Sequence, residues 1–104
     1  MPIPKVLAQS IPSVLTDVYT APQGGAVVST VVVCNQSGAA KFRISIAVAG
    51  AADDTKQYLY YDVDISANRT FTATIGITLA ATDVIRVYSD TGTVSFNIFG
   101  VENP

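Results

Sequence analysis

Residues 70–79 read TFTATIGITL, and residues 41–48 read KFRISIAV. In both stretches, apolar side chains alternate with polar or small side chains almost without a break. Because successive side chains of a β-strand point to opposite faces of the sheet, a period of two places each apolar set on one face. Both stretches are therefore predicted to be half-buried strands and not helices.

A third stretch, residues 58–65, reads YLYYDVDI and shows the same period. We predict a strand whose inner face carries one set of side chains and whose outer face carries the other. The set expected to face the core is Leu59, Tyr61, Val63 and Ile65. The set expected to face outward is Tyr58, Tyr60, Asp62 and Asp64.

Turn-forming residues divide the rest of the chain into short pieces. Strands are predicted over residues 5–11, 14–20, 26–34, 41–49, 57–65, 69–79, 84–89 and 94–101. The turns at residues 35–38 (NQSG) and 90–92 (DTG) are each expected to close a hairpin. About eight short strands without a substantial helix predict one all-β domain over residues 1–104, a β-sandwich that is jelly-roll-like. The order of the strands does not follow from the pattern.

Residues 26–34 (AVVSTVVVC) are mostly apolar at both alternating sets of positions, so both faces of this strand would be apolar. Such a pattern is typical of a central strand that is covered on both sides, within a sandwich or at a contact between subunits. The lone cysteine, Cys34, ends this run and is interpreted as a small buried hydrophobic side chain. With one cysteine, an intramolecular disulfide is impossible.

The composition favours self-association over binding to charged polymers. Of 104 residues, 49% are hydrophobic and only 13% are charged, so some apolar surface is expected to be buried against another chain. The net charge is −2 and the six basic residues are scattered, which argues against nucleic acid as a partner. Residues 1–5 (MPIPK) do not resemble a secretion signal, and the apolar stretches are too short to span a membrane. We therefore expect a protein made in the cytoplasm, without a membrane partner.

Enzymatic activity is not expected. The chain has no histidine, which is the usual general base in serine and cysteine hydrolases. Asp62 and Asp64 could form a carboxylate pair beside Tyr58 and Tyr60, which would supply a surface for stacking sugars, but a solvated strand face is favoured. The same holds for the Asp53-Asp54 loop as a calcium site, so no metal and no cofactor are expected. The glycosylation patterns at Asn35 and Asn68 are interpreted as ordinary turn asparagines.

A row of threonines stands opposite the apolar set of residues 70–79. Thr70, Thr72 and Thr74 lie on one face, followed by Thr78. β-Branched hydroxyl residues stabilise an exposed strand, and this reading is favoured. The sharper reading is a flat contact surface of low charge that docks on a larger assembly.

Three parts of the chain carry a resemblance to known proteins. Residues 15–22 (LTDVYTAP), 31–37 (VVVCNQS) and 58–62 (YLYYD) followed by 71–79 (FTATIGITL) resemble a group of small virion structural proteins of tailed bacteriophages. The resemblance runs over residues 15–101. It implies a compact β-sandwich that decorates or cements a capsid, or that serves as an accessory of the tail. It implies no catalytic residue.

Together these observations predict a non-enzymatic structural protein of a virion. We expect a homotrimer that bridges subunits of the major capsid protein, or of another virion protein, and stabilises the head. Its contact surface is expected to include Tyr58, Tyr60, Asp62 and Asp64 on one strand and Thr70, Thr72 and Thr74 on another. Residues 1–4 could form an extended arm. The alternatives are a tail, fibre or baseplate accessory, a carbohydrate-binding module and, least favoured, a small hydrolase.

Overall fold

The computed structural model describes residues 2–104, which form nine β-strands and two single-turn 3-10 helices. The strands are β1 (Ile3–Ser10), β2 (Thr16–Thr20), β3 (Ala26–Asn35), β4 (Ala40–Ala47), β5 (Tyr58–Ile65), β6 (Thr70–Ala73), β7 (Ile77–Leu79), β8 (Val84–Ser89) and β9 (Val94–Glu102). The 3-10 helices, η1 (Val48–Gly50) and η2 (Thr55–Gln57), both lie between β4 and β5. Seven of the eight predicted strands are present, with bounds that differ by at most two residues from the predicted ones, and the predicted strand over 69–79 is divided into β6 and β7.

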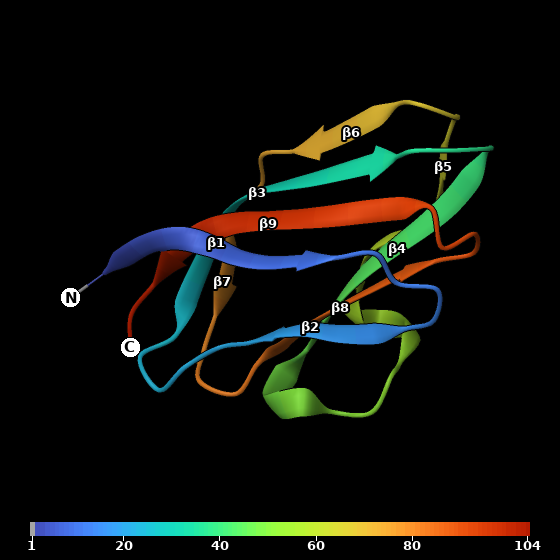
Figure 1. Ribbon diagram of the computed structural model, residues 1–104. Coiled ribbons are helices and arrows are strands. Elements are labelled where there is room, and N and C mark those ends of the chain that lie inside the picture. The colour runs from blue at the N-terminus through green and yellow to red at the C-terminus, as the bar shows by residue number, and fades with distance from the viewer. Residues whose placement is uncertain (1) are drawn as a thin grey trace.

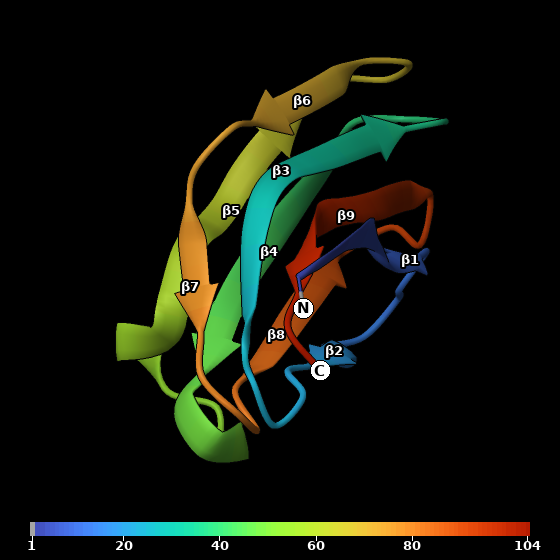
Figure 2. The same ribbon diagram turned by 90° about the vertical axis from the view of Figure 1, so that its left-hand side faces the viewer.

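The strands form two antiparallel sheets that pack face to face (Figure 1). The first sheet has the order β1-β9-β3-β6, and the second has the order β2-β8-β4-β5. The predicted strand over 69–79 is interrupted at residues 74–76, so that β6 pairs with the C-terminal half of β3 and β7 with its N-terminal half. Figure 2 shows β6 and β7 as separate arrows along the same side of β3. The predicted β-sandwich is confirmed, with nine strands where about eight were expected.

The strand order is that of a jelly roll. Four antiparallel pairings, β1 with β9, β2 with β8, β3 with β6 and β7, and β4 with β5, wind the chain up as one long double ribbon. As a result, consecutive strands alternate between the two sheets from β1 to β4. β5 lies beside β4 in the second sheet, and β6 returns the chain to the first sheet. Both expected hairpins are wrong: β3 and β4 belong to different sheets, and so do β8 and β9. A turn sequence shows that the chain reverses, but it does not show whether the next strand pairs with the last one.

The core lies between the sheets and is built from the predicted apolar faces. Phe42 of β4 and Phe96 of β9 come from opposite sheets, are almost completely buried, and meet with ring centroids 6.0 Å apart. Phe71 of β6 packs on Phe42 at 5.3 Å. Burial of each such side chain contributes about 1.5–3 kcal/mol, so these rings are a large part of what holds the two layers together. Apolar side chains from the remaining strands complete the core, among them Val28, Val31, Val33, Ile44, Ile85, Val87 and Ile98.

One glycine permits the close pairing of β9 with β3. A Cβ atom on Gly100 would overlap the carbonyl oxygen of Val27 and crowd the side chain of Leu7. The register of β3 against β9 shifts between Val28 and Thr30, beside this point. A β-bulge of this kind bends the strand and increases its twist, which brings backbone atoms close to the facing strand. The first sheet therefore depends on glycine at position 100.

The N-terminal residues of the described chain belong to the first sheet. Ile3 pairs with Glu102 and Pro4 with Val101, at the open edge that β1 provides. An edge strand is where proline is tolerated, because the missing N–H faces no neighbour. Of the expected arm over residues 1–4, residues 3 and 4 are thus part of β1, and Met1 lies outside the described residues.

Candidate functional site

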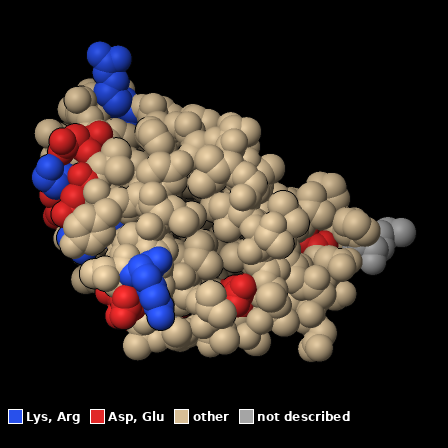
Figure 3. All heavy atoms as spheres, turned by 180° about the vertical axis from the view of Figure 1, so that it is seen from behind, with Lys and Arg blue, Asp and Glu red and all other residues tan. Residues whose placement is uncertain are grey.

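The two sheets differ sharply in the charges that their strands carry. The strands of the second sheet hold Asp17, Lys41, Arg43, Asp62, Asp64 and Arg86. The strands of the first sheet hold only Lys5 and Glu102, which pair with each other at 3.2 Å near the two chain ends. In Figure 3, seen from the side opposite to Figure 1, most charged side chains gather at one side of the view, and the rest of the view shows only isolated acidic groups. The surface is therefore divided into a charged part and a part of low charge.

The outer face of the first sheet is covered by small, aliphatic and hydroxyl side chains. Inward residues of β9 are fully buried, whereas the residues between them are partly exposed and face outward. The outward set has no charged member and comprises Gln9, Val27, Ser29, Val32, Cys34, Thr70, Thr72, Thr78, Ser95, Asn97, Phe99 and Val101. We call these residues the uncharged face. The charged residues next to it along the chain are Arg69, in the turn that precedes β6, and Glu102, which follows Val101 and pairs with Lys5.

The predicted threonine row lies on the uncharged face. Thr70 and Thr72 are exposed on β6, where Thr72 pairs with Val32 and Thr70 with Cys34 of β3. Thr74 is exposed in the break between β6 and β7, and Thr78 is exposed on β7. The row follows the outer edge of the first sheet, so it forms one border of the uncharged face.

The central position of residues 26–34 is confirmed, but their outer side is uncovered in the single chain. β3 lies between β9 and the β6–β7 edge. Val27 keeps 46% of its surface exposed, and Val32 and Cys34 are half-buried. Cys34 is therefore not a core side chain, contrary to the prediction. The outer side of β3 forms the middle of the uncharged face.

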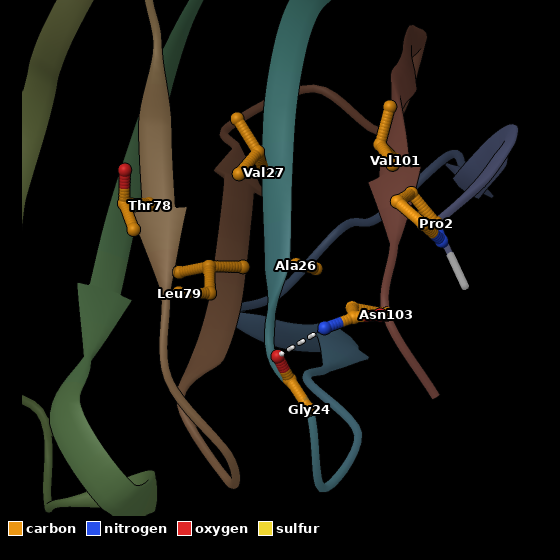
Figure 4. Close-up of a pocket in the computed structure, with 8 residues that line it drawn as sticks. All are labelled: Pro2, Gly24, Ala26, Val27, Thr78, Leu79, Val101 and Asn103. Carbon is orange, nitrogen blue, oxygen red and sulfur yellow. Dashed lines mark hydrogen bonds between the residues drawn. The ribbon is translucent and has the colours of Figure 1, made fainter.

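A shallow hollow of about 250 Å³ lies at the end of the uncharged face that is closest to the chain termini (Figure 4). Val27, Thr78 and Val101 lie side by side across three neighbouring strands and form one part of its wall. Its remaining lining is Pro2, Gly24, Ala26, Leu79 and Asn103. Asn103 closes one side by donating from Nδ2 to the carbonyl oxygen of Gly24 at 3.5 Å. The lining carries no charge and suits an apolar side chain.

On the second sheet, the predicted orientation of residues 59–61 is wrong, whereas Tyr58 faces outward as predicted. Tyr60 points inward and packs on Phe71 at 5.4 Å, whereas Leu59 is 44% exposed and Tyr61 is 55% exposed. The reason is that β5 contains two irregularities against β4, one between the partners of Phe42 and Ile44 and one between the partners of Ile44 and Ser45. Each extra residue reverses the parity of the strand. Val63 and Ile65, beyond the irregularities, face the core as predicted.

The irregular part of β5 assembles a cluster around Arg43. The guanidinium carbon of Arg43 lies 4.2 Å from the ring centroid of Tyr61 and 4.9 Å from that of Tyr88. Its Nε and Nη2 donate to the two carboxylate oxygens of Asp62 at 2.6 and 3.2 Å. Tyr58 meets Tyr61 edge to face at 5.1 Å and donates its hydroxyl to Asp53 at 2.8 Å. We call these residues (Arg43, Asp53, Tyr58, Tyr61, Asp62 and Tyr88) the tyrosine–arginine cluster.

The electrostatics of this cluster follow from its contacts. The hydrogen bonds from Arg43 lower the pKa of Asp62 below its ordinary value, against a smaller opposing effect of burial. The same bonds raise the pKa of the guanidinium. Burial, and then the hydrogen bond to Asp53, raise the pKa of Tyr58. The cluster thus holds the ion pair of Arg43 with Asp62, and the raised pKa keeps the hydroxyl of Tyr58 protonated at neutral pH.

Asp62 adopts a left-handed backbone conformation, with φ at +51°, which is uncommon for residues other than glycine. A non-glycine residue in the left-handed region costs of order 1–3 kcal/mol and is retained only where its surroundings compensate. Here the two bonds from Arg43 hold the side chain. The sequence does not decide which residues of this segment face outward. Tyr58, Leu59, Tyr60 and Tyr61 are all large and largely apolar, so either alternating set could face the core.

The remaining predicted site residues have local structural roles. Lys41 and Asp64 form an exposed ion pair at 2.5 Å. Asp54 caps η2 by accepting from the backbone N–H of Lys56. Asn35 is fully buried and donates to the carbonyl oxygens of Gly38 and Ile65, which makes it a turn residue inaccessible to glycosylation. Among residues 2–104, no group of three or more histidine, cysteine or acidic side chains is arranged to hold a metal ion.

No protein-family model and no curated protein matches this chain. Within the described part of the chain, no helix has both the length and the apolar character needed to cross a membrane. The candidate site consequently has to be judged from its own geometry, with the uncharged face on one sheet and the tyrosine–arginine cluster on the other.

Proposed function

We propose that the protein is a non-enzymatic structural protein that assembles with copies of itself through the uncharged face, and that the assembly belongs to a virion. Within the virion, the copies would bridge neighbouring subunits of the capsid protein and stabilise the head. The observation that carries the proposal is the lack of charge across the outer side of β9, β3, β6 and β7.

An uncharged face is suited to contact with itself. A contact surface without charge avoids like-charge repulsion and the cost of taking ions out of water, whatever the symmetry of the assembly. The strands of the second sheet carry six charged residues, four of which sit on β4 and β5. On the first sheet, Val27, Val32 and Phe99 would be buried without bringing an ion out of water. The occupant that fits this face best is a second copy of the chain.

The dimensions of the molecule agree with such a contact. The chain forms a flat body of 41 × 27 × 18 Å. Its broad sides are on the order of 1,000 Å² each, comparable to the ~800 Å² that one partner contributes to a stable interface. The hollow beside Val27 would accept an apolar side chain of the neighbouring copy.

Two features support the virion as the setting. The chain resembles small structural proteins of tailed bacteriophages over residues 15–101. In addition, the jelly roll is a fold used by viral capsid proteins, although the same fold also serves other functions. The proposed mode of action is addition of many weak contacts through the symmetry of the particle.

The test uses a matched pair of variants on the two sheets. Val27 and Leu59 are aliphatic residues exposed to 46% and 44%, on the first and the second sheet respectively. We expect size-exclusion chromatography with light scattering to give a multiple of 10.9 kDa for the unmodified chain, with a trimer as the expected form. Val27→Asp should weaken assembly by at least about tenfold, whereas Leu59→Asp should not. A monomer at about 100 μM, or equal effects of both variants, would contradict the proposal.

The position within the virion requires a second experiment. Electron cryo-microscopy of a particle that carries this chain should show it on the head, with the uncharged face buried between copies or against the capsid protein. Density for the chain on the tail alone would replace the capsid assignment with that of a tail, fibre or baseplate accessory.

A further inference from the structure

We propose that the tyrosine–arginine cluster on the second sheet binds a neutral pyranose sugar of a glycan. This inference goes beyond the proposed function and does not depend on it, because the cluster and the uncharged face lie on different sheets. The argument rests on an exposed ring, on the hydrogen-bonding groups beside it, and on the local balance of charge.

The exposed ring is that of Tyr61. It keeps 55% of its surface exposed although it lies within a strand, because the irregular pairing of β5 turns it away from the core. Its position is fixed by Arg43 at 4.2 Å from the ring centroid and by Tyr58, whose ring meets it at an interplanar angle of 89°. Arg43 covers one face of the ring, so a sugar would stack on the opposite face, where a tyrosine held in this way has little conformational entropy left to lose on binding. One face of a pyranose ring is lined by C–H groups and stacks on such a surface.

Polar groups of the same cluster accompany the ring. A guanidinium has five N–H donors, of which Asp62 takes two. Asp62 and Asp53 supply carboxylate oxygens, which accept hydrogen bonds from hydroxyls. Each of these groups is already oriented by a partner within the cluster: Asp62 by Arg43, and Asp53 by Tyr58. Preorganised donors and acceptors beside an aromatic surface are what recognition of a polyol requires.

The backbone at this site supports the assignment independently. Asp62 holds φ at +51°, and strained residues and bulges of this kind concentrate where a side chain has to be aimed at a ligand. In contrast, β3 and β9 expose their outer residues with one irregularity in their pairing over nine matched positions. The strain places Tyr61 and Asp62 next to each other on the outer surface.

The charges favour a neutral sugar over an anion and over a protein partner. Arg43 is neutralised by Asp62, Lys41 is paired with Asp64, and Asp53 adds a further negative charge. Phosphate or an acidic sugar would meet a surface that is already acidic. A protein partner would have to bury these ions, and charged residues are depleted from the centres of protein interfaces. A sugar leaves the ions at the rim in contact with water.

The test is titration of the ¹⁵N-labelled chain with cellohexaose, maltohexaose and chitohexaose, followed by two-dimensional NMR. At least one of them should bind with a dissociation constant below about 10 mM. Its chemical-shift changes should centre on Arg43, Tyr58, Tyr61 and Asp62. Tyr61→Ala should weaken binding at least about tenfold, because the stacking surface is removed. Leu59→Ala, at an exposed position on the same strand, should leave binding unchanged.

The opposite results would overturn the proposal. These are absence of binding by all three sugars at about 10 mM, shift changes confined to other surfaces, or full binding by Tyr61→Ala. Because the mapping is done on the unmodified chain, a variant that folds poorly does not leave the question open. Loss of self-association in Tyr61→Ala without any sugar binding would assign the cluster to a protein contact instead. Val27→Asp should keep sugar binding, so failure of the proposed assembly and failure of the sugar site are distinguishable.

Discussion

The outer faces of the two sheets differ in their charge and in the regularity of their strand pairing. On the first sheet, the outward residues of β3 and β9 are uncharged and half-exposed, and the strands are matched over nine positions. On the second sheet, β4 and β5 are matched over five positions with two irregularities, and their outward residues form ion pairs. Since both inner faces are equally apolar, the core does not dictate either outer face. The difference therefore points to what each face contacts.

The largest expected effect tests whether the two faces belong to one cooperative unit. Phe96→Ala removes a ring of the first sheet that is buried against Phe42 of the second, and should lower the free energy of unfolding by about 3–5 kcal/mol. All five tyrosines lie in strands of the second sheet, and the chain has no tryptophan, so tyrosine fluorescence reports on that sheet. In urea denaturation, the tyrosine transition should shift together with far-ultraviolet circular dichroism.

Phe99→Ala is the matched control for this variant. Phe99 is on the same strand but faces outward and is half-buried, so its loss should cost clearly less. A Phe96→Ala protein whose tyrosine transition stays in place would mean that the second sheet folds on its own.

The next effect concerns the regularity of the first sheet. Gly100→Ala places a methyl group against the carbonyl oxygen of Val27, and should destabilise the protein by about 1–3 kcal/mol because β3 and β9 have to move apart. Gly76→Ala is the control, since nothing lies within 4 Å of its would-be Cβ atom. Thermal unfolding measured by calorimetry distinguishes the two. Equal melting temperatures of the two variants would show that β9 can move away from β3 without loss of stability.

A smaller effect, of opposite sign, is expected on the second sheet. Ser45 is fully buried on β4, and its hydroxyl has no hydrogen-bond partner among residues 2–104. Ser45 pairs with Arg86 of β8, whose guanidinium donates to the carbonyl oxygen of Ala51 at 2.8 Å. Ser45→Ala should therefore stabilise the protein by up to about 1 kcal/mol. Ser29→Ala, on the exposed side of the first sheet, should change stability by less. Destabilisation by Ser45→Ala in urea denaturation would indicate that the hydroxyl is hydrated.

The contrast between the faces also explains what the sequence could predict. Residues 70–79 alternate because their inner side is buried and their outer side is not, and this prediction holds at the level of single residues. In residues 41–48, Phe42 and Ile44 are buried as predicted, but Ser45 and Ala47 are buried as well, and Val48 lies beyond β4 with 69% of its surface exposed. Residues 58–61 carry large apolar side chains at every position, so the pattern does not choose a parity. The choice is made by the pairing with β4, where Tyr60 meets Ile44 and Val63 meets Phe42.

Strand order and the candidate site share the same limit. Turns at residues 35–38 and 90–92 reverse the chain, but in a jelly roll the reversed strand crosses to the other sheet. Arg43 and Asp62 were both placed on outward faces by their parity, yet nothing in the sequence makes them neighbours. Their contact arises from the antiparallel pairing of β4 with β5, which is determined by the tertiary structure and not by the local sequence pattern.

The smallest expected effect examines how the ion pair compensates the strain in β5. The pKa of Asp62 is lowered by Arg43 from an ordinary value of 3.8, so the stabilisation it brings is complete above that value and is lost as pH falls through the lower pKa of the folded state. Asp62→Asn removes the charge but keeps a residue that tolerates positive φ. The variant should be less stable than the unmodified chain at pH 7, and the difference should shrink below about pH 4, as measured by urea denaturation across pH. In an Arg43→Gln background, Asp62→Asn should have no such pH dependence. If the difference in free energy of unfolding between the two proteins stays constant down to pH 2, the role of Asp62 lies in its hydrogen bonds alone. The irregular pairing of β5 would then be maintained without a contribution from the charge of Asp62.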